Sequence, residues 1–489
     1  MKSPNVLTRR SFIRQAACAA VGTAGLANAL FDLRRIAAAT MSNTDVLSGD
    51  YKALVCLFLF GGNDANNMIV PVDAVDYAKY VTSRGILALP AAGQAGGILP
   101  ITQIPGHGNA DNYQRTFGFH PSFTDYLAPT NNTLPGLQSL FNSGKLALLG
   151  NVGSLVAPIT KTDYQQNHNL PPQLFSHSDQ QVEWQTSIPD VISRTGWGGR
   201  VADLVNATYG SAAISTCISL NGTNTFQVGD SVVPYSVSPN GAISLNNYAY
   251  GSASGSTSYA IDRLIALNHT NLFEKTFAAT TKRALDNNLL LQGALAISDP
   301  ATSPYNAFNP ASSLASQLKM VARLIAARDI LGLRRQIFFV SVGGYDTHGD
   351  QLNAQNNLYT ELNQSLSAFQ NATETLGISN SVTTFTSSDF GRTFQTNGAG
   401  SDHGWGSHHM IMGGAVQGGG IYGRIPVLQA GGPDDASNGT SGQGRWIPSV
   451  SVDEYAATLA SWFGVTGSSL PVALPNIGRF ANPNLGFLA

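Results

Sequence analysis

Apolar runs that end in turn residues recur along this chain. Residues 52–60 (Lys-Ala-Leu-Val-Cys-Leu-Phe-Leu-Phe) are almost continuously apolar and stop at Gly61 and Gly62. A run of this kind predicts a central strand that is covered on both faces. Runs of the same kind, each followed by turn-forming residues, predict further strands over 146–150, 336–342 and 382–386.

The segments between these strands carry the spacing of amphipathic helices. Apolar side chains recur every three or four residues over 314–330, and a second such segment covers 352–372. Buried strands that alternate with helices are typical of a doubly wound α/β fold with a mostly parallel sheet. A last helix is predicted over 453–463, where Asp453 and Glu454 suit the positive end of the helix dipole.

The stretch from about 220 to 258 interrupts this alternation. It is dense in asparagine, glycine, serine and threonine around short β-like pieces such as 231–235. We interpret it as a β-rich insertion on the main sheet, after which a helical segment over 257–295 returns the chain to the core. The expected organisation is one α/β domain over 50–489 that carries this insertion.

Composition narrows the classes of protein that fit. The 489 residues are 43% hydrophobic and 11% charged, which is too apolar for a disordered chain and too evenly apolar for a membrane bundle. The 27 Lys and Arg against 29 Asp and Glu give a formal charge of -2, so no basic excess predicts nucleic-acid binding. Cys56 and Cys217 lie inside apolar runs, which favours buried, unpaired thiols over a disulfide.

The first residues predict export. The run 8–14 (Thr-Arg-Arg-Ser-Phe-Ile-Arg) matches a twin-arginine signal and precedes an apolar, alanine-rich stretch. An amphipathic helix that happens to begin with two arginines is the alternative. Cleavage is expected after Ala29 or Ala39, so that 1–39 is the signal segment at its longest. We therefore expect a periplasmic or secreted protein with the twin-arginine translocase as its export partner and no transmembrane anchor in the mature chain.

Carboxylates and histidines collect where the predicted strands end and in the loop that follows. They are Asp64, Asp346, His348, Asp389 and His403. In parallel α/β sheets, ligands bind at the carboxyl ends of the strands. Crowded carboxylates repel one another unless a cation holds them, and a mixed Asp and His set suits Zn, Mn or a similar divalent ion. We therefore predict that these five residues hold one or two divalent ions, of Zn, Mn or Ca.

Each candidate ligand also has a purely structural interpretation. Asp64 follows Gly-Gly-Asn and could cap the next helix, where Asp is favoured. Asp346 and His348 could belong to a surface turn. Asp389 could form a structural ion pair with Arg392, three residues further along. The sequence leaves these alternatives open for each residue taken alone, whereas the whole pattern favours the metal site.

A series of short motifs runs through the chain in a fixed order. They are 60–64 (Phe-Gly-Gly-Asn-Asp), 119–121 (Phe-His-Pro), 148–153 (Leu-Leu-Gly-Asn-Val-Gly), 176–179 (Ser-His-Ser-Asp), 196–200 (Gly-Trp-Gly-Gly-Arg), 344–348 (Gly-Tyr-Asp-Thr-His), 389–393 (Asp-Phe-Gly-Arg-Thr) and 402–406 (Asp-His-Gly-Trp-Gly). The series resembles the domain of unknown function 1501 (DUF1501) family, a twin-arginine-exported group placed with the alkaline phosphatase-like superfamily. The resemblance implies an alkaline phosphatase-like sheet but no settled activity.

The superfamily relation implies roles for individual residues. Its enzymes hold two divalent metals and attack with a Ser, Thr or Cys at the start of a helix. By position, Asp64 resembles the ligand after the first strand, Asp346 and His348 resemble a middle pair, Asp389 resembles the acid of a later pair, and His403 resembles the last histidine. Phe390 stands where the later pair would carry a histidine, so a second metal site would lack a ligand, recruit another, or be absent.

The attacking group is expected near the start of a helical segment over 180–186. Ser176 and Ser178 are the candidates, with His177 as a further one. A hydroxyl becomes a good nucleophile only when a metal or a base lowers its pKa. The alternative is that a polar residue here merely caps the helix. Arg392 is a candidate for substrate contact, because a guanidinium fork suits a pair of phosphate or sulfate oxygens.

These observations lead to two hypotheses. The first is an exported metal-dependent hydrolase of phosphate, sulfate or related esters, which acts on a small-molecule or polymer substrate. The second is a non-catalytic exported metal- or ligand-binding protein on the same fold. Phe390 and the open choice of nucleophile favour the second hypothesis, whereas the carboxylates at the strand ends favour the first.

Overall fold

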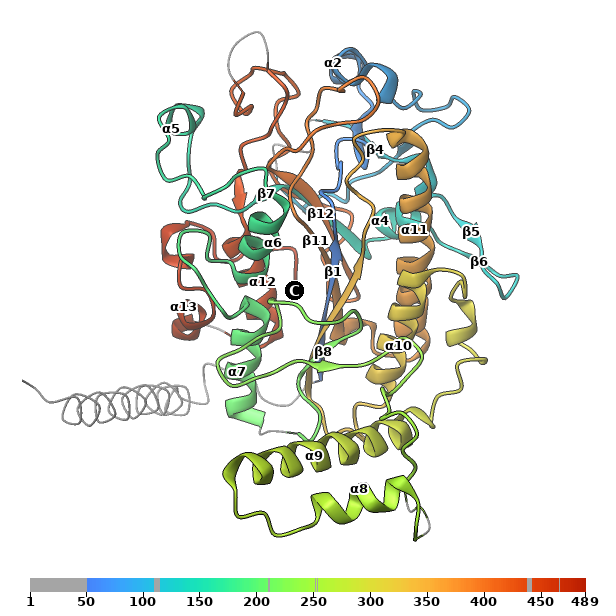
Figure 1. Ribbon diagram of the computed structural model, residues 1–489. Coiled ribbons are helices and arrows are strands. Elements are labelled where there is room, and N and C mark those ends of the chain that lie inside the picture. The colour runs from blue at the N-terminus through green and yellow to red at the C-terminus, as the bar shows by residue number, and fades with distance from the viewer. Residues whose placement is uncertain are drawn as a thin grey trace, which may run out of the picture.

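The computed structural model describes residues 51–109, 115–209, 212–250, 252, 254–437, 442–465 and 467–489. The predicted export signal over 1–39 lies outside these residues. Within the described chain, nine strands form one central sheet in the order β13-β7-β12-β11-β1-β10-β8-β9, with β14 beside β7 (Figure 1). The strands are β1 (Lys52–Leu59), β7 (Leu146–Gly153), β8 (Cys217–Ser219), β9 (Tyr235–Ser236), β10 (Arg335–Val342), β11 (Val382–Ser388), β12 (Ser407–Gly413), β13 (Ile421–Gly423) and β14 (Val450–Ser451).

Most strand pairs in this sheet are parallel. β1 pairs in parallel with β10 on one side and β11 on the other, and β8 continues the parallel series next to β10. β12 is the exception, because it runs antiparallel to both β11 and β7. The prediction of a mixed α/β fold with a mostly parallel sheet is therefore confirmed.

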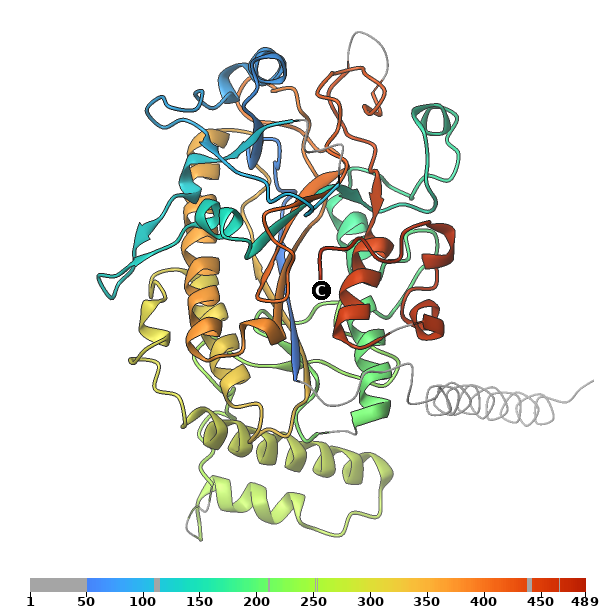
Figure 2. The same cartoon turned by 180° about the vertical axis from the view of Figure 1, so that it is seen from behind.

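Helices cover both faces of the sheet. Figure 1 shows one group on the right of the sheet and the other on the left, and the reverse view in Figure 2 agrees. The first group holds α4 (Leu137–Asn142), α10 (Ser313–Ala326) and α11 (Gln351–Thr375). The second holds α6 (His177–Thr186), α7 (Trp197–Tyr209), α12 (Val452–Phe463) and α13 (Leu470–Ala473).

The sequence of β1 explains how one strand serves two cores. Val55 and Leu57 pack in the core on the α10 and α11 side, whereas Cys56 and Phe58 pack in the core on the α7 and α12 side. Successive side chains of a strand point to opposite faces, so a strand between two helix layers must be apolar at nearly every position. Cys56 and Cys217 are both buried and unpaired, as expected.

Smaller elements complete the described chain. α2 (Ala74–Arg84) and a three-stranded sheet of β2 (Ile69–Pro71), β3 (Leu99–Pro100) and β4 (Phe117–Phe119) follow β1. Further along come the hairpin β5 (Tyr126–Leu127) and β6 (Thr133–Leu134), and the short helix α5 (Lys161–Gln165). Among the described residues, none of the helices combines the length and apolar character that crossing a membrane requires.

The insertion over 220–258 differs from the prediction. Its described part contains one short strand, β9, and otherwise consists of loops, so the expectation of a β-rich segment is wrong. The reason is that a side chain from another element takes the place of a strand partner: the Asp203 carboxylate on α7 accepts hydrogen bonds from the backbone of Asp230, Ser231 and Val232. The helical segment that follows forms α8 (Thr257–Ile265) and α9 (Leu272–Leu295), at the end of the molecule away from α2 (Figure 1).

Candidate metal centre

Three segments that are far apart in sequence meet at the carboxyl end of the sheet. Asp346 lies in the loop after β10, His177 is the first residue of α6, and His403 lies in the loop between β11 and β12. Each offers one ligand atom, and the three atoms lie within 4.8 Å of one another.

The separations inside the group match those around a small divalent ion. The Nε2 atom of His403 lies 3.3 Å from Oδ1 of Asp346, and Nε2 of His177 lies 3.6 Å from the same oxygen. A tetrahedral ion with bonds of about 2.0–2.2 Å holds its ligand atoms about 3.3–3.6 Å apart. The His177 Nε2 atom is also buried and has no hydrogen-bond partner, so an acceptor is left free at this point.

The other ring nitrogen of each histidine is already engaged. Nδ1 of His177 lies 2.7 Å from Oδ2 of Asp389, and Nδ1 of His403 lies 2.8 Å from the backbone oxygen of Phe175. Both acceptors fix the proton on Nδ1, which leaves Nε2 with a lone pair that faces the group. Histidines that bind metals usually donate their second N–H to a carboxylate or a carbonyl in this way.

Asp389 is placed as the hydrogen-bond partner of His177. Its side chain is fully buried, and its oxygens accept hydrogen bonds from the backbone of Gly61 and from the side chain of Gln181, besides His177. It does not pair with Arg392, so the structural ion pair considered for it is absent. Asp389 therefore orients the imidazole of His177 from behind.

Arg392, the candidate for substrate contact, is buried and bonds to Asp346 instead. Its buried guanidinium donates to Oδ1 of Asp346 at 2.8 Å, to the backbone oxygen of Gly61 and to that of Ser401. Burial alone would raise the pKa of Asp346, but Arg392 and the neighbouring histidines outweigh it and hold that pKa below its usual value. Asp346 is thereby kept ionised and fixed in position.

The rings of His177 and His403 rest on an aromatic neighbour. Phe390 lies with its ring centre 4.8 Å from each of the two imidazoles. Burial lowers the pKa of His403, although the Phe175 carbonyl opposes this effect. A neutral imidazole is the form that binds a metal. Phe390 thus packs against both imidazoles of the group.

His348 stands beside the group. Its Nε2 atom lies 3.1 Å from Oδ1 of Asp346 and 2.9 Å from Nε2 of His403, and its Nδ1 atom lies 3.2 Å from Oδ1 of Asp402. The side chain is 45% exposed. Because His348 lies at the open edge of the group, its side chain is available for proton transfer as well as for binding a metal ion.

Asp64 is not brought into this group. Its fully buried carboxylate forms an ion pair with Arg84 of α2 and also accepts hydrogen bonds from Gln351 and Asn66. Because a guanidinium and amide N–H groups already occupy both oxygens, this carboxylate serves the packing between the loop after β1, α2 and α11.

The two serine candidates also face elsewhere. The hydroxyl of Ser176 donates to the Asp179 carboxylate at 2.5 Å, and that of Ser178 lies 3.2 Å from the same oxygen. No contact in the described chain joins either hydroxyl to Asp346. Of the three candidates at the start of α6, the structure brings His177 alone into the group.

Sequence reasoning missed one residue here, Arg445. Its Nε donates to the backbone oxygen of His403 at 2.9 Å, and its guanidinium lies 4.6 Å from the ring centre of Phe175. The terminal nitrogens of this side chain have no hydrogen-bond partner among the described residues. A partly exposed cation therefore lies beside the group. Arg445 is identified by its contacts in the structure and not by its neighbours in the sequence.

Comparisons with known proteins give a family but no activity. The family described as "Protein of unknown function (DUF1501)" matches residues 51–437. A search of curated proteins finds no match. Among solved structures, one similar chain is that in "Crystal structure of Ps i-CgsB in complex with k-i-k-neocarrahexaose", with 8% sequence identity and a TM-score of 0.32, covering 89% of this chain and 78% of that one.

Proposed function

Because this chain belongs to the DUF1501 family, whose description assigns no activity, we propose its function from the site: a metal-dependent hydrolase of phosphate, sulfate or related esters. The single observation that carries the proposal is the group of His177, Asp346 and His403, with the unpartnered Nε2 atom of His177 and ion-sized separations. Three protein ligands with a remaining open position are typical of catalytic metal sites.

The donor atoms favour a particular kind of ion. Two imidazole nitrogens and one carboxylate oxygen suit Zn or Mn better than Ca, which prefers oxygen ligands alone. One group of this size supports one ion, with Asp389 as the residue that orients His177. A divalent ion, when bound, supplies Lewis acidity that polarises an ester oxygen.

The surrounding residues suit an anionic ester. The terminal nitrogens of Arg445 can bind two oxygens of a phosphate or sulfate group in a fork. His348, which is backed by Asp402, can give a proton to the departing alcohol. Water is the proposed nucleophile, because the hydroxyls of Ser176 and Ser178 bond to Asp179. Arg392 holds Asp346 in place.

The direct test combines metal analysis with turnover. Purified protein should contain close to one Zn or Mn ion per chain and should hydrolyse p-nitrophenyl phosphate or p-nitrophenyl sulfate. The variant His177→Ala should lose both properties, whereas His269→Ala, which changes a partly buried histidine near α8 that lies outside the group, should keep them. A wild-type protein that takes up no divalent ion would refute the proposal.

The second candidate function is non-catalytic metal binding. It is favoured by the two serines that turn away from the group and by the lack of a second cluster among the described residues. The same assays separate the two functions. Stoichiometric metal without turnover of either ester would leave metal binding as the function of this site.

We also propose that the sheet is of the alkaline phosphatase-like type. Support comes from the doubly wound topology and from the side chains that the loops after β10 and β11 contribute to one end of the sheet. An experimental structure in which this family's strand order departs from that superfamily would contradict the assignment.

Export through the twin-arginine translocase, to the periplasm or beyond, is a further part of the proposal. It rests on the run 8–14, outside the described residues. Replacing Arg9 and Arg10 together by lysine should retain the protein in the cytoplasm, whereas Arg34→Lys should be exported normally. Equal export of both variants would contradict this pathway.

A further inference from the structure

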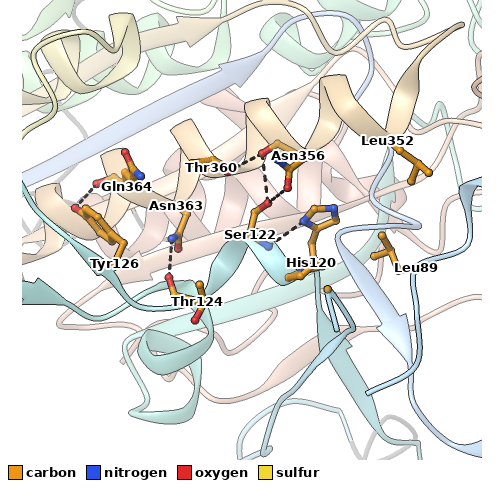
Figure 3. A pocket seen from close by; sticks show the side chains of 12 residues that line it. Leu89, His120, Ser122, Thr124, Tyr126, Leu352, Asn356, Thr360, Asn363 and Gln364 are labelled. Carbon is orange, nitrogen blue, oxygen red and sulfur yellow. Dashed lines mark hydrogen bonds between the residues drawn. The ribbon is translucent and has the colours of Figure 1, made fainter. Parts of the chain in front are cut away.

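A separate cleft lies along α11, away from the group that involves Asp346. It has a volume of about 450 Å³ and lies between α11 and the chain over 120–126 (Figure 3). Leu352, Asn356, Thr360 and Gln364 line it from the helix. Their spacing of four residues places them on one face of α11, which is apolar at Leu352 and polar over the two turns from Asn356 to Gln364.

The lining of the cleft carries no formal charge. None of the 12 residues that line it is Asp, Glu, Lys or Arg. An ionic ligand would lose water without gaining an opposite charge, which is costly. A wholly apolar ligand would leave side-chain amides without partners, which is also costly. The occupant that fits is neutral and rich in hydrogen-bonding groups.

One buried side chain in the lining has a free hydrogen-bonding atom. His120 is 2% exposed, and its Nδ1 accepts a hydrogen bond from the backbone of Ser122. Burial lowers its pKa to about 4, so the ring is neutral and Nε2 carries the proton. This N–H has no partner among the described residues, and Figure 3 shows it on the side of the ring that faces Leu89 and Leu352.

Two amides add further donors. The Asn356 side-chain oxygen accepts from Ser122 Oγ at 2.9 Å, and the Gln364 side-chain oxygen accepts from Asn309 at 3.4 Å. The NH₂ group of each amide has no partner in the described part of the chain. Leu89, Leu352 and Pro121 supply apolar surface in the same cleft.

We propose that this cleft binds a neutral disaccharide. Sugar hydroxyls can accept from the N–H groups of His120, Asn356 and Gln364, and the C–H faces of the ring can pack on the leucines and the proline. The cleft is therefore a binding site of its own, and the proposal does not depend on the function proposed for the metal centre.

The test is direct binding by calorimetry, with the neutral disaccharides maltose, cellobiose and lactose as probes. At least one should bind to the full chain. Asn356→Ala and Gln364→Ala remove donors from an exposed and a half-buried position and should each weaken binding about fivefold to tenfold. The control Asn357→Ala, on the exposed part of α11 outside the cleft, should bind as the wild type does.

Further probes make the proposal falsifiable. Glucose 6-phosphate and galactose 6-sulfate are tested on the metal-free Asp346→Asn variant, so that the proposed ester site does not contribute, and there they should bind no more tightly than the neutral sugars. Asp346→Asn should leave sugar binding unchanged, which separates this site from the metal centre. The proposal is overturned if no disaccharide binds, if the two variants bind as tightly as the wild type, or if the charged sugars or a neutral tripeptide such as Gly-Asn-Gly bind preferentially.

Discussion

Asp64 and Asp346 occupy similar places in the fold, since one follows β1 and the other follows its neighbour β10. Asp64 is fully buried against Arg84 and two amides, whereas the Asp346 side chain is 46% exposed and faces histidine nitrogens. The end of a parallel strand therefore supplies a position for a carboxylate but not its role. Each carboxylate pairs with a buried arginine, so the difference lies in the remaining neighbours, which are amides around Asp64 and histidine nitrogens at the half-exposed Asp346.

The largest effect on stability should come from removing Asp64, the buried carboxylate of the two. Asp64→Ala leaves the Arg84 guanidinium buried without its counter-ion, which costs about 3–5 kcal/mol of the free energy of unfolding. Urea denaturation measures the loss. Asp286→Ala is the matched control, because its exposed pair with Lys282 contributes less than about 1 kcal/mol. Equal losses in the two variants would show that the Asp64 pair is not decisive for the packing.

Asp346, the exposed member of the pair, should affect metal affinity more than stability. Asp346→Asn removes one of the three proposed ligands, so metal affinity should fall at least about a hundredfold. The metal-free protein should lose less free energy of unfolding than Asp64→Ala does, because the Asp346 side chain is half exposed and asparagine keeps an oxygen that accepts from the buried Arg392. Metal titration and urea denaturation on the same sample give both numbers. A variant that kept full metal affinity would remove Asp346 from the site.

How far the sequence predicts this site depends on the range of the signals. The long apolar runs predict β1, β10 and β11, because a strand covered on both faces needs apolar residues throughout. Asp346 and Asp389 could then be placed at one end of the sheet. The burial of Asp64 could not be predicted, because its partner Arg84 belongs to another element. The residues next to Asp64 in the sequence do not indicate this ion pair.

The positions of His177 and Asp389 depend on how the helices and loops pack together. His177 was predicted as a possible nucleophile, and it joins the group because α6 begins beside the loops after β10 and β11. Asp389 was predicted as a metal ligand, and its contacts are with Gly61 and with Nδ1 of His177. Residue type and spacing predicted that Asp and His side chains gather at this end of the sheet, whereas the contacts of each one needed coordinates.

Glu183 is a third carboxylate for this comparison, and it is buried without a cation as its partner. Burial raises the pKa of Glu183 on α6 to about 7, above the value near 4.3 of an unfolded chain. Between these values the folded protein holds a proton that the unfolded chain has released. Its contribution to stability is therefore full at low pH and is lost as pH rises toward 7, by up to about 1.4 kcal/mol per pH unit.

Glu183→Gln tests this contribution. The amide cannot ionise, so the free energy of unfolding should vary less steeply between about pH 5 and 7 than in the wild type. Asp453, whose pKa burial also raises to about 7, retains its share of the slope in this variant. Urea denaturation at a series of pH values measures the difference, and parallel curves for the two proteins would contradict the assignment.

The smallest expected effect separates two carboxylates that each support a histidine. Asp389→Asn removes the charge behind His177, a proposed ligand, and should weaken metal binding about tenfold to a hundredfold. Asp402→Asn makes the same change behind His348, which stands outside the three-residue group, and should weaken it by less than about threefold. Metal titration of both variants decides between them. A larger loss for Asp402→Asn would exchange the roles, and would make His348 the ligand that completes the site in place of His177.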